Sequence, residues 1–376
     1  MVAVDGGLFY SFDSTISEFL KVIFFTILAR GKKMYHPRFK GQPYEMGKKM
    51  GTFFKKAKVK FPINLDPFQI EFGKKSGKLL QEYFPEAVAE IKGITDVIEL
   101  NNELFTSWMM CMGCCLEISD GASVEVRGCT AFSFTHKGKV IHGRDNDLPP
   151  FLKRVSKSIY YQPENKLRFI LNTSSFINGE EGINEFGLVV AMTFVKPKIE
   201  EIKPGINSVF LVRYLLENCK TVADGIEALQ KLPIASSCNI LLTDKKGDMV
   251  VVECNPVKLN IRYPEQNNYG NNFIITVNHF TSKEMWKHDA SNRMLFSSGK
   301  RYQTVLNALT KMEFNDCVQY AKDILRGEFG FICQYERNLN FETIWSSVFD
   351  ISGNKIYRAE GNPQKVKYIE DKRLFK

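Results

Sequence analysis

The sequence reads Arg127-Gly128-Cys129-Thr130-Ala131-Phe132-Ser133-Phe134 where its side chains begin to alternate with the period of two that is typical of a β-strand. The turn residues His136-Lys137-Gly138-Lys139 follow, and then the run Val140-Ile141-His142-Gly143. Two such runs joined by a short segment containing glycine predict a β-hairpin. The second strand continues into Arg144-Asp145-Asn146-Asp147, so the hairpin would bring these charged residues back toward its own start.

Cys129 is the candidate nucleophile at the start of this hairpin. The positive charge of Arg144 would favour the thiolate, which is the form that attacks carbonyl groups. Asp147 would orient an amine, and that amine would be the α-amino group of Cys129 itself if the chain were cut after Gly128. Such an amine titrates at about 7.7 to 8.0, so it can accept the thiol proton and later protonate a leaving amine.

Gly128 suits the cleavage point because a residue without a Cβ permits the strained backbone that attack on its carbonyl requires. The competing interpretation of Cys129 is a core residue, since free cysteine is among the most buried residue types. None of the five histidines stands in a Cys-His-Asn context that would supply another base.

The rest of the chain predicts an α+β fold. Apolar residues recur at helical spacing through residues 44–112. Strands are expected at 168–172 and 187–195, with a hairpin over 239–253. Between them, helices are expected at 208–218 and from Thr221, whose hydroxyl can cap the amides near Asp224. This order favours sheets covered by helices.

The composition indicates a single globular unit of 376 residues, 44% of them hydrophobic, with one large domain or two intimate ones. The formal net charge is +9, but the basic residues are interpreted as scattered among 42 acids, apart from clusters such as Lys55-Lys56 and Lys245-Lys246. No nucleic-acid-binding motif is present. A solvated surface is the preferred interpretation, and attraction for an anionic substrate is the alternative.

Nine cysteines at irregular spacing do not form a disulfide framework, which favours a reducing compartment and therefore the cytoplasm. The tightest group, Cys111, Cys114 and Cys115, lacks a second CxxC or a His pair at zinc spacing, so buried apolar thiols are expected rather than metal ligands. No metal and no cofactor is implied.

Residues 16–29 are apolar but are interrupted by Glu18 and Lys21, and three basic residues follow them. The run is too short to span a bilayer, and its charges stand on the wrong side for a secretory signal. A core or peripheral helix is expected, with a membrane-surface helix as the alternative. Met34 could also be the natural start, which would make residues 1–33 an extension.

The hairpin resembles the mature N-terminus of the choloylglycine-hydrolase and acid-ceramidase-like N-terminal-nucleophile (Ntn) hydrolases. Over the whole chain, from about Arg38 nearly to the C-terminus, the sequence is similar to the acyl-coenzyme A:6-aminopenicillanic acid acyltransferase family. The segment Phe39-Lys40-Gly41-Gln42-Pro43-Tyr44-Glu45-Met46-Gly47 resembles the G-x-x-Y-x-x-G opening of that family. The resemblance implies a four-layer αββα Ntn fold.

Three further segments carry the resemblance. Gly182-Ile183-Asn184-Glu185-Phe186-Gly187-Leu188 is similar to the G-x-N-E-x-G-L turn, and a purely structural turn is preferred over direct catalysis. Thr276-Val277-Asn278-His279-Phe280 resembles the T-N-H segment, whose Asn donates to the oxyanion; a strand-end cap is the alternative. Asp289-Ala290-Ser291-Asn292-Arg293 resembles the S-x-x-R element that supplies an active-site Arg, although its spacing is Ser-x-Arg. A surface salt bridge is the alternative role of Arg293.

Two positions depart from the family pattern. The turn of this chain reads Arg144-Asp145-Asn146-Asp147, whereas the related turn reads Arg-Asn-x-Asp. Asp145 therefore places an extra carboxylate near the site. Thr193 occupies a strand position where bile-salt hydrolases commonly carry Asn or Tyr, so specificity for bile salts is not expected.

Residues 1–33 are interpreted as an N-terminal extension. The resemblance implies that residues 34–128 are a helical pro-segment that stays associated after cleavage and that residues 129–376 are the catalytic part. It implies hydrolysis of linear acyl amides through an acyl-thioester on Cys129, with Arg144, Asp147, Asn278 and Arg293 in support. The alternatives are an acyl-coenzyme A-dependent N-acyltransferase and a non-catalytic acyl-ligand binding protein, for which 30 Phe residues could form a pocket. The expected partners are a small acyl amide or acyl thioester, with no nucleic acid and no stable membrane insertion. The sequence neither requires nor excludes a homo-oligomer.

Overall fold

The computed structural model describes residues 34–61, 63–116, 118–119, 122–123, 128–291, 297–311, 314–333, 335–336 and 341–375. The predictions for residues 1–33 and for Arg293 lie outside these ranges.

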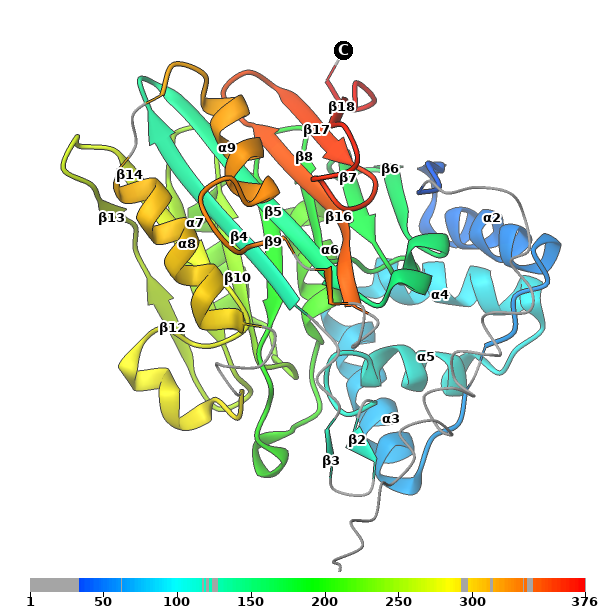
Figure 1. Cartoon of the computed structure of the whole chain (residues 1–376). Helices are drawn as coiled ribbons and strands as arrows, with labels where there is room; N and C mark the ends of the chain where they lie inside the picture. Colours follow the sequence, from blue (N-terminus) through cyan, green and yellow to red (C-terminus); the bar gives the residue numbers. More distant parts are fainter. Residues whose placement is uncertain are drawn as a thin grey trace, which may run out of the picture.

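Two large sheets form the centre of the molecule (Figure 1). The first sheet has the order β1-β6-β7-β8-β9-β10-β11-β12, with β1 (Arg38–Gly41), β6 (Lys157–Pro163), β7 (Phe169–Thr173), β8 (Glu181–Asn184), β9 (Val189–Phe194), β10 (Cys238–Thr243), β11 (Met249–Cys254) and β12 (Leu259–Arg262). The second sheet has the order β13-β14-β4-β5-β16-β17-β18, with β13 (Glu265–Gln266), β14 (Asn272–Thr276), β4 (Gly128–His136), β5 (Lys139–Leu148), β16 (Phe341–Asp350), β17 (Lys355–Ala359) and β18 (Ile369–Glu370). Short strands complete the set: β15 (Tyr335–Glu336) pairs with β16, and β2 (Ile118–Ser119) pairs with β3 (Ala122–Ser123).

Helices cover the outer faces of both sheets. The first sheet is covered by α6 (Ser208–Asn218) and α7 (Val222–Lys231), and the second by α8 (Ser298–Thr310) and α9 (Cys317–Arg326). The sheets face each other, with β4 against β9. This arrangement confirms the expected four-layer αββα sandwich.

Four helices precede the sandwich and pack beside it: α2 (Pro43–Lys56), α3 (Pro67–Tyr83), α4 (Pro85–Ile98) and α5 (Asn102–Cys111). Local sequence explains several of their starts. Asp66 and Gln69 form a capping box at α3, and proline stands in the first turn of α2, α3 and α4, where its missing N–H costs nothing. Within the described residues, no helix has both the length and the apolar character needed to cross a membrane.

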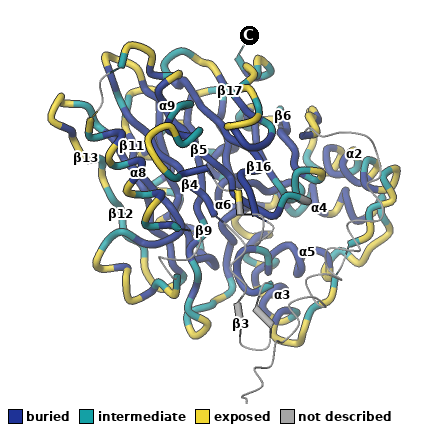
Figure 2. Tube along the Cα trace, viewed as in Figure 1, coloured by how far each residue is buried: buried dark blue, intermediate teal, exposed yellow. Residues whose placement is uncertain are grey.

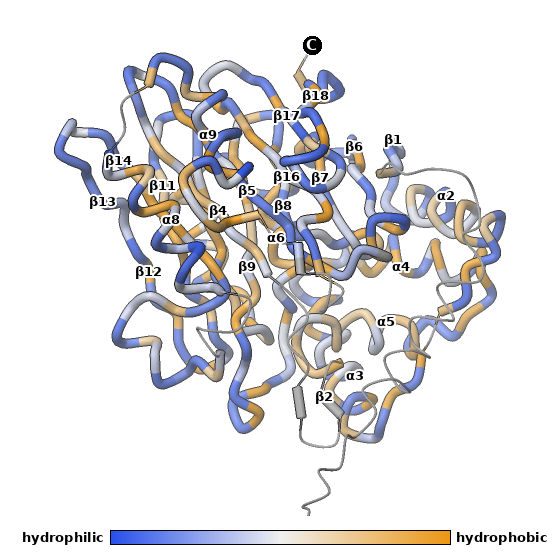
Figure 3. The backbone as a smooth tube through the Cα atoms, viewed as in Figure 1, coloured by the Kyte–Doolittle hydropathy of each residue, from blue (hydrophilic) through white to orange (hydrophobic). Residues whose placement is uncertain are grey.

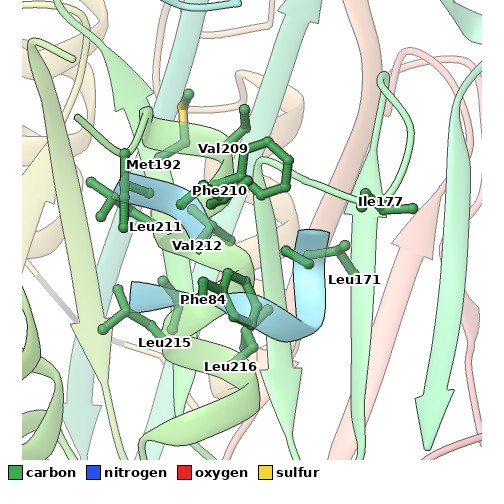
Figure 4. Packing of buried hydrophobic residues seen from close by; sticks show 14 of the residues in the cluster. Phe84, Leu171, Ile177, Met192, Val209, Phe210, Leu211, Val212, Leu215 and Leu216 are labelled. Atoms are coloured by element: carbon green, nitrogen blue, oxygen red, sulfur yellow. The ribbon is translucent and has the colours of Figure 1, made fainter. Parts of the chain in front are cut away.

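The main hydrophobic core joins these helices to the sandwich. It contains Met46 and Phe84 from the N-terminal helices, Phe210 and Leu216 from α6, and Met192 from β9. Figure 4 shows Phe84 against the apolar side of α6. Figure 2 shows buried residues running continuously from the sheets into this region, and Figure 3 shows apolar residues concentrated along the same strands. The N-terminal helices therefore share a core with the sandwich.

The predicted hairpin is confirmed as β4 and β5, with the turn at Lys137 and Gly138. Its register places Cys129 opposite Asn146 and Gly128 opposite Asp147. Side chains alternate along a strand, so Cys129 and Asn146 point to one face of the sheet while Asp147 points to the other. Helix α6 occupies the predicted residues, and Thr221 caps α7 in a capping box with Asp224.

Candidate active site

Cys129 lies near the start of β4 and is 3% exposed. Its Sγ is 3.3 Å from Nη2 of Arg144 and 3.4 Å from Oδ1 of Asn146. Burial raises the pKa of the Cys129 thiol; Arg144 opposes that rise, while Asp147 adds to it. The predicted Cys129 and Arg144 pair is therefore in contact, and the guanidinium is positioned to stabilise a thiolate.

Arg144 is fully buried between the two sheets. Its Nη2 also donates to Oδ1 of Asn146 at 2.8 Å and to the carbonyl of Met192 at 3.0 Å, and its Nη1 faces Oε2 of Glu181 at 3.5 Å. These acceptors come from both sheets, so Arg144 bridges them beside the thiol.

Glu181 on β8 supplies the negative charge that accompanies Arg144. Its Oε1 accepts hydrogen bonds from Asn172 Nδ2 at 2.7 Å, Trp345 Nε1 at 2.9 Å and Ser347 Oγ at 2.6 Å. These three donors and Arg144 satisfy the buried carboxylate, whose burial without partners would cost several kcal/mol of stability. Glu181 is not predictable as a site residue from the sequence, because nothing in its local motif indicates a partner on the opposite sheet.

Asp147 lies beside Gly128, its register partner across the hairpin. A Cβ on Gly128 would be 3.1 Å from Oδ2 of Asp147, and Oδ1 accepts a hydrogen bond from Thr343 at 2.5 Å. Burial raises the pKa of Asp147 to about 6, against the opposing effect of Arg301. The carboxylate therefore adjoins the peptide bond predicted to be cut.

The reason for glycine at position 128 differs from the one expected. Gly128 lies in a regular strand and is not among the glycines with a positive φ, so its backbone does not need a left-handed conformation. Space is the constraint instead, because an added Cβ would lie 3.0 Å from Phe341 as well as close to Asp147. A small residue lets the two strands and the carboxylate approach closely.

Asn278 follows β14 and reaches the start of β4. Its Oδ1 accepts from the backbone N–H of Cys129 at 2.7 Å, and its Nδ2 donates to the carbonyl of Phe194 at 2.9 Å. The first sheet holds the segment that contains Val277 and Asn278 in place. Thr193 and Asn239, both on strands of this sheet, donate to the carbonyl of Val277, at 2.6 and 3.0 Å. Thr193, which departs from the family pattern, thus positions the Asn278 segment.

Arg301 on α8 lies in the candidate site, although the sequence motifs predict Arg293 instead. It is fully buried and donates to the carbonyl of Cys129 at 2.5 Å, to Thr130 Oγ1 at 2.7 Å and to Asn278 Oδ1 at 2.9 Å. A signal for it was present, since Ser298-Gly299-Lys300-Arg301 has the S-x-x-R spacing that the segment ending at Arg293 lacks. Ser298 also accepts from the backbone N–H of Asn278 at 3.1 Å.

Asp145, the extra acid of the hairpin, is fully buried on the face that carries Asp147. Burial, with Asp147 as the next cause, raises the pKa of Asp145 well above its ordinary value. Asp145 is therefore harder to ionise than an exposed carboxyl group.

The remaining site predictions concern turns and thiols. Asn184 Oδ1 accepts from the backbone N–H groups of Phe186 and Leu188, both at 3.1 Å, and Gly187 has a φ of 85°, so this segment is the structural turn that was preferred. All nine cysteines are free and buried. No group of three potential ligands for a metal ion occurs in the ranges that the structure describes.

Comparison with known proteins supports the resemblance. A model of the family described as acyl-coenzyme A:6-aminopenicillanic acid acyl-transferase matches residues 134–365, more than half of the chain. Among solved structures, the chain is similar to penicillin V acylase from Agrobacterium tumefaciens, with 18% identity over 62% of this chain and 83% of that chain and a TM-score of 0.42. It is also similar to the Caenorhabditis elegans ortholog of N-acylethanolamine-hydrolyzing acid amidase, with 17% identity over 60% and 93% of the two chains and a TM-score of 0.45. A variant of conjugated bile acid hydrolase from Clostridium perfringens has 14% identity over 65% and 92%, with a TM-score of 0.40. The match of the family model confirms the family predicted from the motifs.

Proposed function

The chain belongs to the acyl-coenzyme A:6-aminopenicillanic acid acyl-transferase family, and from that premise we propose that it is a cysteine amidase that cleaves linear acyl amides after cutting itself before Cys129. The observation that carries the proposal is the contact of Arg144 Nη2 with Cys129 Sγ at 3.3 Å, next to a Cys129 nitrogen held by Asn278. Cys129 supplies the nucleophile, Arg144 supplies a charge that favours the thiolate, and Asn278 supplies a polar group at the Cys129 nitrogen.

In the proposed self-cleavage, Cys129 Sγ attacks the carbonyl carbon of Gly128. The peptide C–N bond breaks, the thiol proton passes to the departing nitrogen of Cys129, and a thioester joins Gly128 to Sγ. Water hydrolyses this thioester, which leaves a carboxylate on Gly128 and a free α-amine on Cys129. Residues 1–128 then form a separate chain that contains the helical pro-segment, residues 34–128, and residues 129–376 form the catalytic chain.

In turnover, the α-amine of Cys129 accepts the thiol proton and Sγ attacks the carbonyl of an acyl amide. Asn278 and backbone amides stabilise the oxyanion. The C–N bond breaks as the leaving amine takes the proton, and water hydrolyses the acyl-thioester. Asp147 holds the ammonium form of the amine, and Arg144 stabilises the thiolate. Arg301 fixes Asn278 and the Cys129 carbonyl; Arg293 remains a prediction for the same kind of role.

The test is the intact mass and N-terminal sequence of the purified protein. Two fragments are expected, one of them beginning Cys129-Thr130-Ala131, together with release of free acid from acyl amides. Cys129→Ala should abolish both events, whereas Cys317→Ala, which removes a buried thiol outside the site, should preserve them. A processed and active Cys129→Ala protein would refute the proposal, and a single uncut chain that binds acyl ligands without consuming them would favour the binding protein.

A second candidate is N-acyl transfer from acyl-coenzyme A, which the description of the matching family model favours. Both reactions pass through the same acyl-thioester and differ in whether water or an amine releases the acyl group. An assay with an acyl donor and a competing amine separates them, because transfer gives N-acyl product faster than free acid.

The nine free, buried thiols support a reducing compartment, and we propose the cytoplasm.

A further inference from the structure

The positive charge of the chain is concentrated in one short segment and is not scattered as the sequence analysis interpreted it. Residues 34–61 contain eight Lys and Arg residues and one acid, Glu45, so they contribute +7 of the formal net charge of +9. This segment forms β1, α2 and the connection after α2. α2 lies at the outer edge of the helical part of the molecule (Figure 1).

Seven of the eight basic residues in this segment are exposed. Lys55 pairs with Glu99, and we call the other six the basic face: Arg38, Lys40, Lys49, Lys56, Lys58 and Lys60. Lys49 Nζ donates to the carbonyl of Lys40 at 3.2 Å, which joins the helix to the strand. Lys49 and Lys56 are seven residues apart and so lie on the same side of α2 two turns apart. The buried side of the helix, including Met46, Met50 and Phe54, packs into the core.

The charge of the basic face is not neutralised by neighbouring acids. Lys48 pairs with Glu45 and Lys55 pairs with Glu99. Across the part of the chain that the structure describes, no carboxylate lies within ion-pair distance of the six residues of the basic face. A cluster of four to eight such residues is what an anionic surface attracts, at about 1 kcal/mol per residue near a lipid bilayer.

Two features favour lipid over nucleic acid as the partner. Five of the six residues are Lys, a compact point charge, rather than Arg, whose planar fork suits directed contacts with bases and single phosphates. The same segment also carries Tyr35 and Tyr44, which are 48% and 37% exposed, and amphipathic aromatic rings are enriched at membrane interfaces.

We propose that the basic face docks the protein onto an anionic lipid surface. A polybasic cluster binds such a surface reversibly, because each charge contributes only about 1 kcal/mol. This proposal stands independently of the proposed amidase function. If the chain is an amidase, however, docking would present it to amphiphilic acyl amides that partition into lipid.

The experiment is co-sedimentation of the full-length protein with vesicles. The probes are phosphatidylcholine alone and phosphatidylcholine mixed with phosphatidylserine, each at low and high salt. Binding is expected to the mixed vesicles and to weaken in high salt. Lys56→Gln/Lys58→Gln/Lys60→Gln should lower the partition coefficient on the order of 100-fold.

The matched control is Lys245→Gln/Lys246→Gln/Lys258→Gln, which removes the same number of exposed charges from turns of the first sheet. It should bind vesicles as the unaltered protein does, and thermal unfolding should show that both variants are folded. Equal binding to both kinds of vesicle, equal losses in the two variants, or no binding to anionic vesicles would each overturn the proposal. Lysine-dependent binding to a short RNA with no vesicle binding would overturn it in favour of nucleic acid.

Discussion

Cys129 is held by side chains from four separate segments: Arg144 on the neighbouring strand, Asn278 after β14, Arg301 on α8 and, through Arg144, Glu181 on the opposite sheet. Each of these residues is buried and hydrogen-bonded, so the geometry of the thiol depends on contacts that span the sandwich. Substitutions that preserve size but change one contact are therefore informative.

Arg301→Lys is expected to slow both processing and turnover by about 10- to 100-fold, because a Lys keeps the charge but cannot donate to Cys129, Thr130 and Asn278 together. Single-turnover kinetics with an acyl amide would measure the effect. Arg293→Lys is the comparison; if it causes the larger loss, Arg293 is the active-site arginine that the sequence predicts.

Glu181→Gln should destabilise the fold by about 3 to 5 kcal/mol, since it leaves the buried Arg144 without its opposite charge. Urea unfolding in a Cys129→Ala background would measure this without interference from processing. Glu185→Gln is the control. Glu185 pairs with the exposed Arg168, so its substitution should lower the free energy of unfolding by at most about 1 kcal/mol. Equal effects of the two changes would contradict the assigned role of Glu181.

Asp147 makes stability depend on pH. Its pKa of about 6 in the folded chain lies above the ordinary value of 3.8, so the neutral form favours folding and stability falls as pH rises through 6. In the Cys129→Ala background, Asp147→Asn should remove a loss of about 2 to 3 kcal/mol between pH 4 and pH 7. Asp145→Asn should also reduce the fall in stability with rising pH, because burial raises the pKa of Asp145 in the folded chain while the unfolded chain ionises at the ordinary value. Thermal melts across this range would measure both effects, and an unchanged profile in the Asp147→Asn protein would contradict the prediction for Asp147.

At the scale of elements, β4 and β5 place every predicted residue of the hairpin, and both could be predicted because alternation and turn residues act locally. Helix α6 was predictable for the same reason. The neighbours of the hairpin were not: β14 pairs with β4 from more than a hundred residues away, and β16 pairs with β5. No local pattern encodes such pairings, nor the packing of α8 and of the facing sheet that brings Arg301 and Glu181 to the site.

Gly128→Ala tests the tight fit between β4 and β5. The new methyl group would press on Asp147 and Phe341, so processing should slow at least several-fold while the hairpin stays folded. The fraction of cut chain against time after synthesis, read from intact mass, measures this. Thr135→Ala, farther along β4, should process normally, and a normal rate for Gly128→Ala would show that space at residue 128 does not matter.

At the scale of the whole molecule, a buried ionic cluster joins the N-terminal helices to the sandwich. Arg213 on α6 donates to Glu90 on α4 at 2.9 Å and to Glu217 at 2.8 Å, and its guanidinium lies 4.0 Å from the ring of Tyr161 on β6. Burial raises the pKa of Glu90, which the arginine opposes. If the chain is cut before Cys129, this cluster links the two fragments.

Arg213→Met should therefore make the processed fragments separate at a lower urea concentration, because it leaves two buried carboxylates without a cation, at a cost of about 3 to 5 kcal/mol. Size-exclusion chromatography in increasing urea would measure the separation. Lys166→Gln is the control, because it removes only the partly exposed ion pair of Lys166 with Glu86. It should change the urea concentration at which the fragments separate very little. Co-elution of the fragments at the same urea concentration in all three proteins would contradict the role of Arg213.

Strand β1 has a consequence for how the protein can be produced. It precedes the proposed cut, yet it pairs in parallel with β6 and closes one edge of the first sheet. A gene encoding only residues 129–376 would expose the backbone of β6 as a free edge, and free edges template aggregation. Recombinant work on the mature catalytic chain would therefore need the N-terminal segment expressed alongside it, as a folding partner supplied in trans.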